Sequence, residues 1–301
     1  MKILILGSGY IGSEIAYEFS KDNQITCIDH GDNFSKISSK LKNVKLIKGD
    51  ILDHELVKNI SNEMDLICYC IGTGGVVNCI ENPDHYKKIN IDDFKKLLDS
   101  IENKNCRFLL LSTTFVYSNS EKNFENMQTN PDTIYGKLRL QQESILMNSE
   151  LSYTILRMSN IYGHKNFWIR KFDNVIDKFI STGFSNKKIL LYADGTQLVD
   201  FIHISNFLNI LNQIINQKFQ KEIYNITSET RQSIHDIALL IKNIAGKKYN
   251  ISIQINKNDS SKKLPNIPDA SASKIKNKII WQDYQDLSFE LEKMCAKIMN
   301  D

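Results

Sequence analysis

The chain contains 301 residues, with 38 Lys and Arg against 35 Asp and Glu, so its formal net charge is only +3. That balance excludes the basic footprint of a dedicated nucleic-acid binder. A hydrophobic content of 42% is that of an ordinary globular protein, and no apolar run approaches the roughly 20 residues of a membrane-spanning helix, so we expect no membrane partner. The six cysteines show no metal-ligand spacing and indicate a reduced, cytoplasmic protein without a metal.

In the first half of the chain, short apolar runs alternate with amphipathic stretches. Unbroken apolar runs are typical of strands buried on both faces, and they occur at residues 2–6, 24–28, 44–47, 66–71, 107–111 and 153–156. The helix-like stretches between them lie near residues 11–19, 53–60, 91–101 and 135–147. This alternation predicts an α/β fold of the Rossmann type, with a doubly wound parallel sheet and helices on both faces.

After about Gly163 the alternation becomes irregular. Predicted strands are sparse, at residues 189–193, 223–226 and 251–255, and the polar segment 256–273 predicts a surface loop. We expect residues 1–165 to form the sheet domain, with a segment near 200–227 returning to it. Residues 166–301 are expected to form a smaller, C-terminal substrate-binding lobe.

A glycine-rich turn directly follows the first predicted strand and opens the first predicted helix. Gly7 permits the tight turn, Gly9 lets the backbone approach a pyrophosphate, and Gly12 lets helix and strand pack closely. The N–H groups at the start of the helix and its positive dipole end favour phosphate binding. The turn therefore predicts a dinucleotide site that includes Tyr10 and Ile11.

An acidic residue, Asp29, ends the second predicted strand, 22 positions after Gly7. A carboxylate at this place accepts hydrogen bonds from the adenine-ribose hydroxyls and repels a 2′-phosphate, which favours NAD over NADP. Its neighbour His30 weakens this preference slightly, because an imidazole can carry a positive charge. We therefore predict NAD as the cofactor, with NADP as the less favoured alternative.

Hydroxyl groups follow the fifth predicted strand at Thr113 and Thr114, where open α/β sheets bind ligands. Further on, Tyr135 and Arg139 are four residues apart on a predicted helix and share a face. A tyrosine acts as a general acid and base when a nearby cation favours its phenolate. Each group alone is common in a purely structural role, but their order after a nucleotide-binding turn predicts Thr113, Tyr135 and Arg139 as catalytic residues.

This ordered series resembles the extended short-chain dehydrogenase/reductase family, specifically its NAD-dependent sugar-nucleotide epimerase/dehydratase group, over essentially the whole chain. The resemblance implies a sugar or nucleotide-sugar substrate and a homodimer in which helices 91–101 and 135–147 are candidate contact surfaces. Beyond the glycine turn, Asp29 and His30, the residues it implies for cofactor binding are Asp50, Ile51, Ile71, Asn90, Tyr135 and Arg139. Those it implies for the substrate are Thr113, Thr114, Asn160, Arg170 and Arg231.

Three positions depart from the family pattern. Leu6 stands where a further glycine is usual, and Arg139 stands where the family has a catalytic lysine. Val199 replaces an arginine that holds the diphosphate of the substrate, which makes Lys165, Arg170, Lys171 and Arg231 the candidates for that role. An arginine keeps the positive charge of a lysine but presents a planar fork, so the exchange at position 139 is not neutral.

The type of reaction follows from what is missing beside the catalytic threonine. Family members that dehydrate or decarboxylate sugars carry an acid there, whereas this chain has Thr114 and Phe115. Elimination needs a second acid/base pair, so dehydration ranks low. We therefore predict an NAD-dependent epimerase, with an NAD(P)H-dependent 4-keto-sugar reductase as the alternative. A non-catalytic, NAD-sensing binding protein is a second alternative, which intact Thr113 and Tyr135 argue against.

Overall fold

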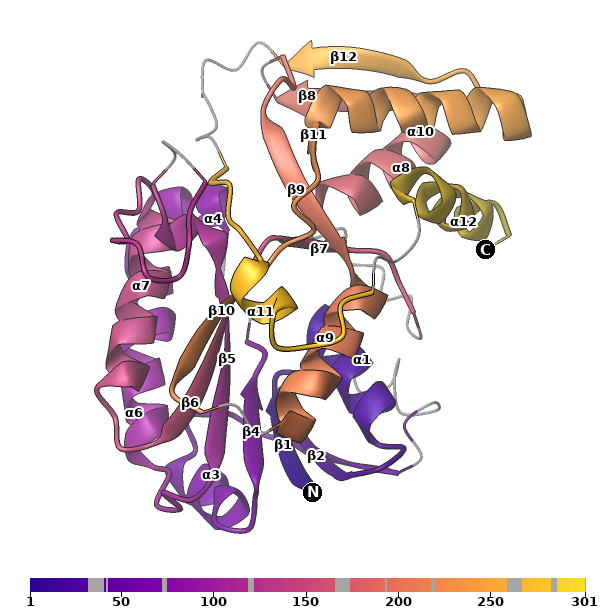
Figure 1. The fold of residues 1–301 in the computed structure, drawn as a ribbon. Helices are drawn as coiled ribbons and strands as arrows, with labels where there is room; N and C mark the ends of the chain where they lie inside the picture. Colours follow the sequence, from indigo (N-terminus) through magenta and orange to yellow (C-terminus); the bar gives the residue numbers. More distant parts are fainter. Residues whose placement is uncertain are drawn as a thin grey trace.

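Seven parallel strands form the central sheet of the computed structural model (Figure 1). In chain order they are β1 (Lys2–Leu6), β2 (Gln24–Asp29), β3 (Val44–Lys48), β4 (Leu66–Tyr69), β5 (Arg107–Thr113), β6 (Ser152–Met158) and β10 (Glu222–Ile226). The structure describes residues 1–31, 41, 43–71, 75–118, 122–165, 174–192, 194–217, 220–258, 267–282 and 286–300. The spatial order β10-β6-β5-β4-β1-β2-β3 reverses direction between β1 and β4, which confirms the expected doubly wound, Rossmann-type α/β fold.

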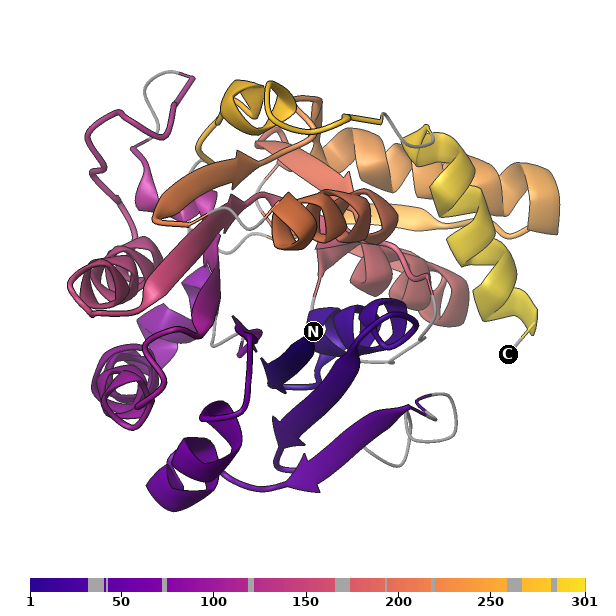
Figure 2. The same cartoon turned by 60° about the horizontal axis from the view of Figure 1, so that its bottom comes forward.

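Helices cover both faces of this sheet. They are α1 (Tyr10–Phe19), α3 (His54–Ser61), α6 (Phe94–Asp99), α7 (Ile134–Met147) and α9 (Ile204–Gln217). Helices α1 and α9 lie side by side (Figure 2) and share a core with Ile3 and Ile5 of β1. Leu4 and Leu6 of the same strand point to the other face and pack with α3, α6 and α7. The strand alternates between two cores, as its unbroken apolar sequence requires.

The helix expected near residues 91–101 is built differently. It begins with α5 (Pro83–Lys87), continues as the π-helical segment η1 (Lys88–Asp93) and ends as α6. A π-helical turn holds one residue more per hydrogen-bonded turn than an α-helix and so changes the helical register. The fully buried Asn90 lies within it.

The C-terminal lobe has its own strands and helices. Its strands are β7 (Asn160–Tyr162), β8 (Lys188–Tyr192), β9 (Leu198–His203), β11 (Arg231–Ser233) and β12 (Gln254–Asn258), and its helices are α8 (Val175–Asn186), α10 (Ile234–Tyr249) and α12 (Leu287–Asn300). Strands β11, β9 and β7 form a three-stranded sheet, and β8 pairs with β12. The three helices bury their own apolar core with β8 and β9. From β9 the chain enters α9, beside α1, and then β10.

The strand expected at residues 251–255 lies three residues further along, as β12, so the start of the segment expected as a loop at 256–273 is a strand. The strand starts later than expected because the cap of α10 occupies the residues before it. Asn250 adopts a left-handed conformation (φ 54°), and the Ile251 N–H donates to the Ala245 carbonyl, so the residues after it still belong to the helix cap. Pairing with β8 and the packing of Ile255 against the core of the lobe then order this mostly polar strand.

One edge of the large sheet is formed by β10, and side chains form hydrogen bonds with two of its outward-facing backbone groups. The Asn225 N–H donates to Glu125 Oε1 at 2.8 Å. Two residues earlier, the Ile223 carbonyl accepts from Lys274 Nζ at 2.9 Å. The edge strand is thereby hydrogen-bonded at its centre on the side that has no neighbouring strand.

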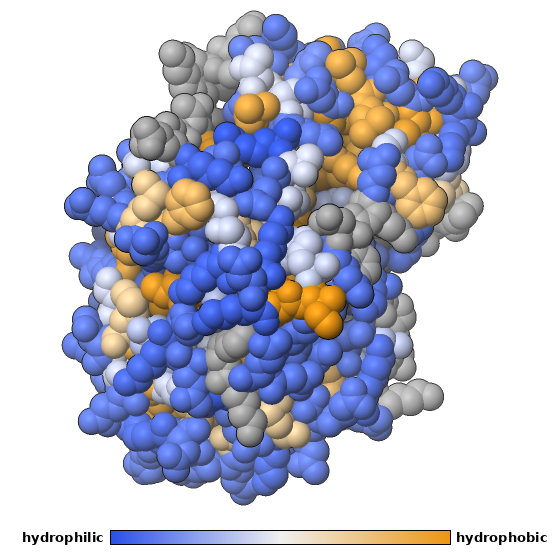
Figure 3. Space-filling view, viewed as in Figure 1, coloured by the Kyte–Doolittle hydropathy of each residue, from blue (hydrophilic) through white to orange (hydrophobic). Residues whose placement is uncertain are grey.

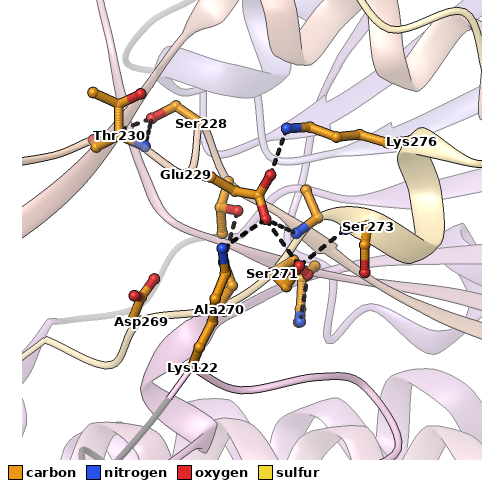
Figure 4. A network of polar contacts seen from close by, with 12 residues as sticks. Lys122, Ser228, Glu229, Thr230, Asp269, Ala270, Ser271, Ser273 and Lys276 are labelled. Atoms are coloured by element: carbon orange, nitrogen blue, oxygen red, sulfur yellow. Dashed lines mark hydrogen bonds and ion pairs between the residues drawn. The ribbon is translucent and has the colours of Figure 1, made fainter.

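A polar clamp ties the turn after β10 to the segment before α11 (Ser273–Lys276) (Figure 4). At its centre, Glu229 has a positive φ of 61°, which is uncommon for a residue with a side chain. Its carboxylate accepts from Ser271 Oγ at 2.8 Å and pairs with Lys276 Nζ at 2.5 Å and Lys122 Nζ at 3.1 Å. Hydrogen bonds from these groups lower the pKa of Glu229 to about 2, against the effect of burial.

Replacing Glu229 with glutamine is expected to lower the free energy of unfolding by roughly 1–2 kcal/mol, because two lysines and one hydroxyl lose a charged acceptor. Since the folded-state pKa of Glu229 lies below its unfolded value, this contribution is present above pH 4.5 and is lost as the pH falls toward 2. Urea unfolding of both proteins at neutral and acidic pH measures the difference. A difference that did not shrink in acid would contradict the charge-based origin.

The face of the molecule in Figure 3 is mostly hydrophilic, and its largest hydrophobic area lies over the C-terminal lobe. Among the described residues, no helix is both long and apolar enough to cross a membrane.

Candidate active site

The glycine turn lies at the carboxyl end of β1, where the order of the strands reverses. Gly7 has a φ of 90°, and a Cβ on Gly12 would lie 2.0 Å from the Gly7 carbonyl oxygen, so both positions require glycine. A Cβ on Gly9 would meet nothing within 4 Å, so this N-cap of α1 borders open space. Ile71 lies directly beside Gly7, as expected of a residue that lines the same site.

Tyr10 and Asp29 both form hydrogen bonds with other residues of the chain. The Tyr10 hydroxyl donates to the Gly163 carbonyl, at the end of β7, and burial raises its pKa well above the usual range. Asp29 Oδ2 accepts from the Ser8 N–H at 2.6 Å and from the Ser8 hydroxyl at 2.9 Å. The carboxylate therefore holds the glycine turn through one oxygen, and among the described residues its other oxygen has a single long contact, 3.4 Å from the Gly31 N–H.

The remaining residues predicted to flank the adenine lie near the ends of β2 and β3. His30 is exposed directly after β2. Asp50 Oδ1 accepts from the Leu52 N–H at 2.9 Å in the turn before α3, and Ile51 packs against the core under that helix. Their place at the carboxyl edge of neighbouring strands is consistent with the prediction.

Thr113 and Tyr135 come from β5 and α7. Thr113 is buried and caps the short helix η2 (Thr114–Val116) by accepting from the Phe115 N–H at 3.3 Å. A Cβ on Gly136 would lie 2.1 Å from the Phe115 carbonyl oxygen, so α7 begins in direct contact with η2. This close approach sets the Tyr135 ring 5.9 Å from the Phe115 ring, next to the end of β5.

Arg139 lies one turn after Tyr135 and is buried under the helix. Its guanidinium donates to the Leu111 carbonyl, to Gln142 Oε1 at 2.6 Å and to Asn90 Oδ1 at 3.5 Å. The structure thus brings Arg139 and Asn90 together. Its Nε has no hydrogen-bond partner among the described residues.

The predicted substrate residues are less well grouped. Thr114 is buried in η2, and Asn160 Nδ2 contacts the Asp200 carbonyl oxygen at 3.5 Å. Arg231 Nη2 donates to the carbonyls of Leu198 at 3.0 Å and Ile267 at 2.8 Å, so this guanidinium is engaged by backbone of the lobe. Arg170 lies outside the described residues. Val199, at the position of the missing arginine, packs into the core of the lobe.

Residues 3–227 match the NAD dependent epimerase/dehydratase family. The chain belongs to this family. The match covers most of the chain and includes the glycine turn, Thr113, Tyr135 and β10, and it confirms the predicted family.

Two curated relatives illustrate the range of this epimerase/dehydratase family. The dTDP-D-glucose 4,6-dehydratase of Dictyostelium discoideum is 28% identical over 273 residues, which cover 81% of this chain and 62% of that protein. A Bacillus subtilis protein named as an uncharacterized UDP-glucose epimerase is 28% identical over 268 residues, which cover 82% of this chain and 83% of that protein. The crystal structure of UDP-glucuronic acid 4-epimerase from Bacillus cereus, in complex with UDP-glucuronic acid and NAD, shares the fold, with a TM-score of 0.85 at 24% identity over 100% and 99% of the two chains.

The sequence analysis missed a buried ion pair that lies beneath the candidate active site. Glu143 of α7 and Arg157 of β6 are almost completely buried and lie 2.7 Å apart. The Ser112 hydroxyl, beside Thr113, donates to Glu143 Oε1, and the pair extends through the Tyr117 hydroxyl, which accepts from Arg157 Nη1 at 2.9 Å. The available signal was Arg157, an ionisable residue within an otherwise apolar strand run.

Replacing Asp29 with alanine is expected to weaken NAD binding by about 10- to 100-fold, the effect of losing a charged hydrogen-bond acceptor. The loss for NADP is expected to be smaller, because the negative charge that repels a 2′-phosphate disappears as well. Fluorescence titration with NADH and NADPH measures both affinities. The Ser8→Ala variant is the control, since it removes one contact to Asp29 but keeps the charge; equal losses for both cofactors in Asp29→Ala would contradict a direct role.

Proposed function

We propose that this protein is an NAD-dependent epimerase that oxidises a hydroxyl of a nucleotide sugar to a transient keto sugar and returns the hydride to the opposite face. One observation carries the proposal: Thr113 at the end of β5 and Tyr135 at the start of α7 lie on the same edge of the sheet as the glycine turn. Since all seven strands are parallel, their carboxyl ends share this edge, which is where such sheets bind ligands.

NAD, when bound, accepts and returns the hydride. Tyr135 takes the proton of the sugar hydroxyl as the hydride leaves the carbon, and it gives a proton back when the carbonyl is reduced. The Thr113 hydroxyl holds the same oxygen in place. The two halves of the reaction cancel, so the net product is the epimer and no cofactor is consumed.

The absence of an acid beside Thr113 favours epimerisation over elimination. Positions 114 and 115 hold a threonine buried in η2 and a phenylalanine whose ring faces Tyr135. Neither can remove a proton from carbon, the step that dehydration adds to hydride transfer. The relatives named as UDP-glucose epimerase and dTDP-glucose dehydratase support a nucleotide-sugar substrate.

Incubating the purified protein with UDP- and dTDP-linked hexoses and hexuronic acids, and following the products by NMR, tests this proposal. The expected result is a mixture of two epimers without added cofactor. Stoichiometric use of NADH with 4-keto sugars would identify a reductase instead. A 4-keto-6-deoxy product would identify a dehydratase, and bound NAD with no conversion of any sugar would identify a sensor.

We also propose a homodimer and a division of the chain near residue 165. Separate apolar cores under the sheet and in the C-terminal lobe support the division. Exposed apolar side chains on two neighbouring helices, Val77 and Ile80 on α4 (Val76–Glu81) and Ile134 on α7, support a contact surface on this side. Light scattering of the wild type and of Ile80→Asp measures the oligomeric state; a monomeric wild type would contradict the dimer.

A further inference from the structure

His203 ends β9, at the point where the chain leaves the C-terminal lobe and enters α9 beside the sheet domain. Its side chain is buried. A Cβ on Gly163, which follows β7, would lie 2.1 Å from His203 Nε2, so the imidazole lies directly against the backbone of Gly163. The Gly163 carbonyl accepts from the Tyr10 hydroxyl of α1. The imidazole therefore lies at the junction between the lobe and the sheet domain.

The imidazole of His203 caps the first turn of α9. The Ser205 N–H, which is too close to the start of the helix to have a partner within it, donates to His203 Nδ1 at 3.2 Å. A nitrogen that accepts a hydrogen bond carries no proton, so the proton of the neutral ring lies on Nε2. A second proton would have to bind Nδ1, where it would face the Ser205 N–H and the positive end of the helix. The cap therefore requires the neutral imidazole.

The charges around His203 favour this neutral form on balance. Burial lowers the pKa of His203 below its usual value of 6.5, and Lys293, His164 and Lys165 act in the same direction, whereas Glu290 raises it. Glu290 Oε2 of α12 lies 3.4 Å from His203 Nε2, but Nε2 forms no hydrogen bond with the described residues, and Lys293 pairs with the same carboxylate at 2.9 Å. The other titratable groups that border the ring or the cavities beside it are Tyr162, Asp286, Glu18, Lys21, Asp22 and Lys297.

Two cavities border His203 and give a charged ring room to move. One, of about 520 Å³, lies between α1, α9 and α12. The other, of about 250 Å³, lies between β9 and the segment that leads into α12. Polar side chains line both cavities, among them Asn209 and Gln232. An imidazolium can therefore turn away from Ser205 into polar surroundings, which lowers the cost of its charge.

We propose that His203 is an acid-sensitive cap that ties the C-terminal lobe to the sheet domain: the neutral imidazole holds the first turn of α9, and its protonation releases that turn. Helix α9 packs beside α1, which begins at the glycine turn, so the release weakens the connection between the lobe and the cofactor helix. Since the folded-state pKa of His203 lies below the unfolded value, its stabilising effect is complete above pH 6.5 and is lost as the pH falls toward the folded-state pKa.

The His203→Asn variant removes the titration but keeps a capping side chain, because an asparagine oxygen accepts from the same kind of N–H. In the wild type, this residue is expected to raise the equilibrium constant for unfolding about tenfold between pH 7.5 and 5.5, the effect of protonating a histidine in the unfolded chain alone. Urea unfolding measures this constant. In His203→Asn this part of the rise is expected to be missing, whatever the stability of the variant at pH 7.5.

His54→Asn is the matched control, since His54 is an exposed histidine at the start of α3. It is expected to keep the pH dependence of the wild type. If the wild type and His203→Asn showed the same change between pH 7.5 and 5.5, the proposal would be wrong.

Hydrogen exchange followed by mass spectrometry locates the release. After correction for intrinsic exchange rates, the peptide that covers the start of α9 is expected to lose about tenfold in protection at pH 5.5 in the wild type and to keep its protection in His203→Asn. A loss spread evenly over the chain would contradict a local cap.

NMR of the wild type labelled with ¹⁵N-histidine tests the cap even if His203→Asn fails to fold. Of the six histidines, at least one is expected to stay neutral at pH 5.5, with its proton on Nε2. If every imidazole were charged at that pH, or if the neutral one carried its proton on Nδ1, the proposal would fail. These measurements need no sugar substrate, so their outcome is independent of the proposed function.

Discussion

The Tyr135→Phe variant is expected to lose about 10²- to 10⁴-fold in turnover, the usual contribution of a general acid and base. Phenylalanine keeps the ring that packs beside Phe115 and the cluster with Leu138 and Tyr86, so the fold is expected to persist. NAD binding is expected to stay within a few-fold of wild type, because the glycine turn and Asp29 lie on other elements. Rates of epimer formation and NADH titrations measure the two effects.

The control for this variant is Tyr153→Phe, which makes the same chemical change at the start of β6, at the opposite end of the strand from the site. Its turnover is expected to equal that of the wild type. If Tyr135→Phe converted the substrate at the wild-type rate, Tyr135 could not be the acid and base. If the wild type itself converted nothing and both variants bound NAD equally, the protein would fit the NAD-sensing alternative better.

The Arg157→Met variant is expected to lower the free energy of unfolding by about 3–5 kcal/mol, because it leaves the carboxylate of Glu143 buried without its partner. Glu143 is fully buried, and its charge raises the pKa of Arg157. The substitution also removes the Arg157 group that donates to the Tyr117 hydroxyl. That hydroxyl donates in turn to Asn225 Oδ1 at 2.7 Å. Urea unfolding measures the change.

The double variant Glu143→Met with Arg157→Met is the control for this ion pair. It removes both charges and fills the space with apolar side chains, so it is expected to be more stable than either single variant. This comparison is informative even if a single variant fails to fold. Additive losses in the double variant would contradict a coupled pair.

The architecture of the first half could be predicted because its strands are buried on both faces. An unbroken apolar run as short as that of β1 is typical of a buried parallel strand, and the glycine turn marks the helix that follows it. In the lobe, β8 was predicted within one residue and β12 three residues early, whereas β7, β9 and β11 carried no such signal. β9 contains Asp200 and His203, β7 has only three residues, and β12 is ordered by its pairing with β8. Their side chains reflect neighbours that are distant in the sequence.

The candidate site, too, could be predicted in part. The positions of Gly9, Thr113 and Tyr135 follow from local rules about turns and strand ends, and their roles stay predictions until they are measured. The contacts of Arg139 with the Leu111 carbonyl and Gln142 could not be predicted, since they depend on how α7 packs against β5. The assignment of Arg231 to a diphosphate failed to anticipate that two backbone carbonyls already bind it.

The hydrogen bonds along β10 have a consequence for how this protein behaves at high concentration. A sheet with a bare outer strand can recruit a strand from a neighbouring molecule and grow into an aggregate. Here the Asn225 N–H already donates to Glu125 and the Ile223 carbonyl already accepts from Lys274, so an incoming chain would have to displace these two side chains to pair there. Removing both side chains would therefore be expected to leave catalysis unchanged and to make the protein precipitate more readily.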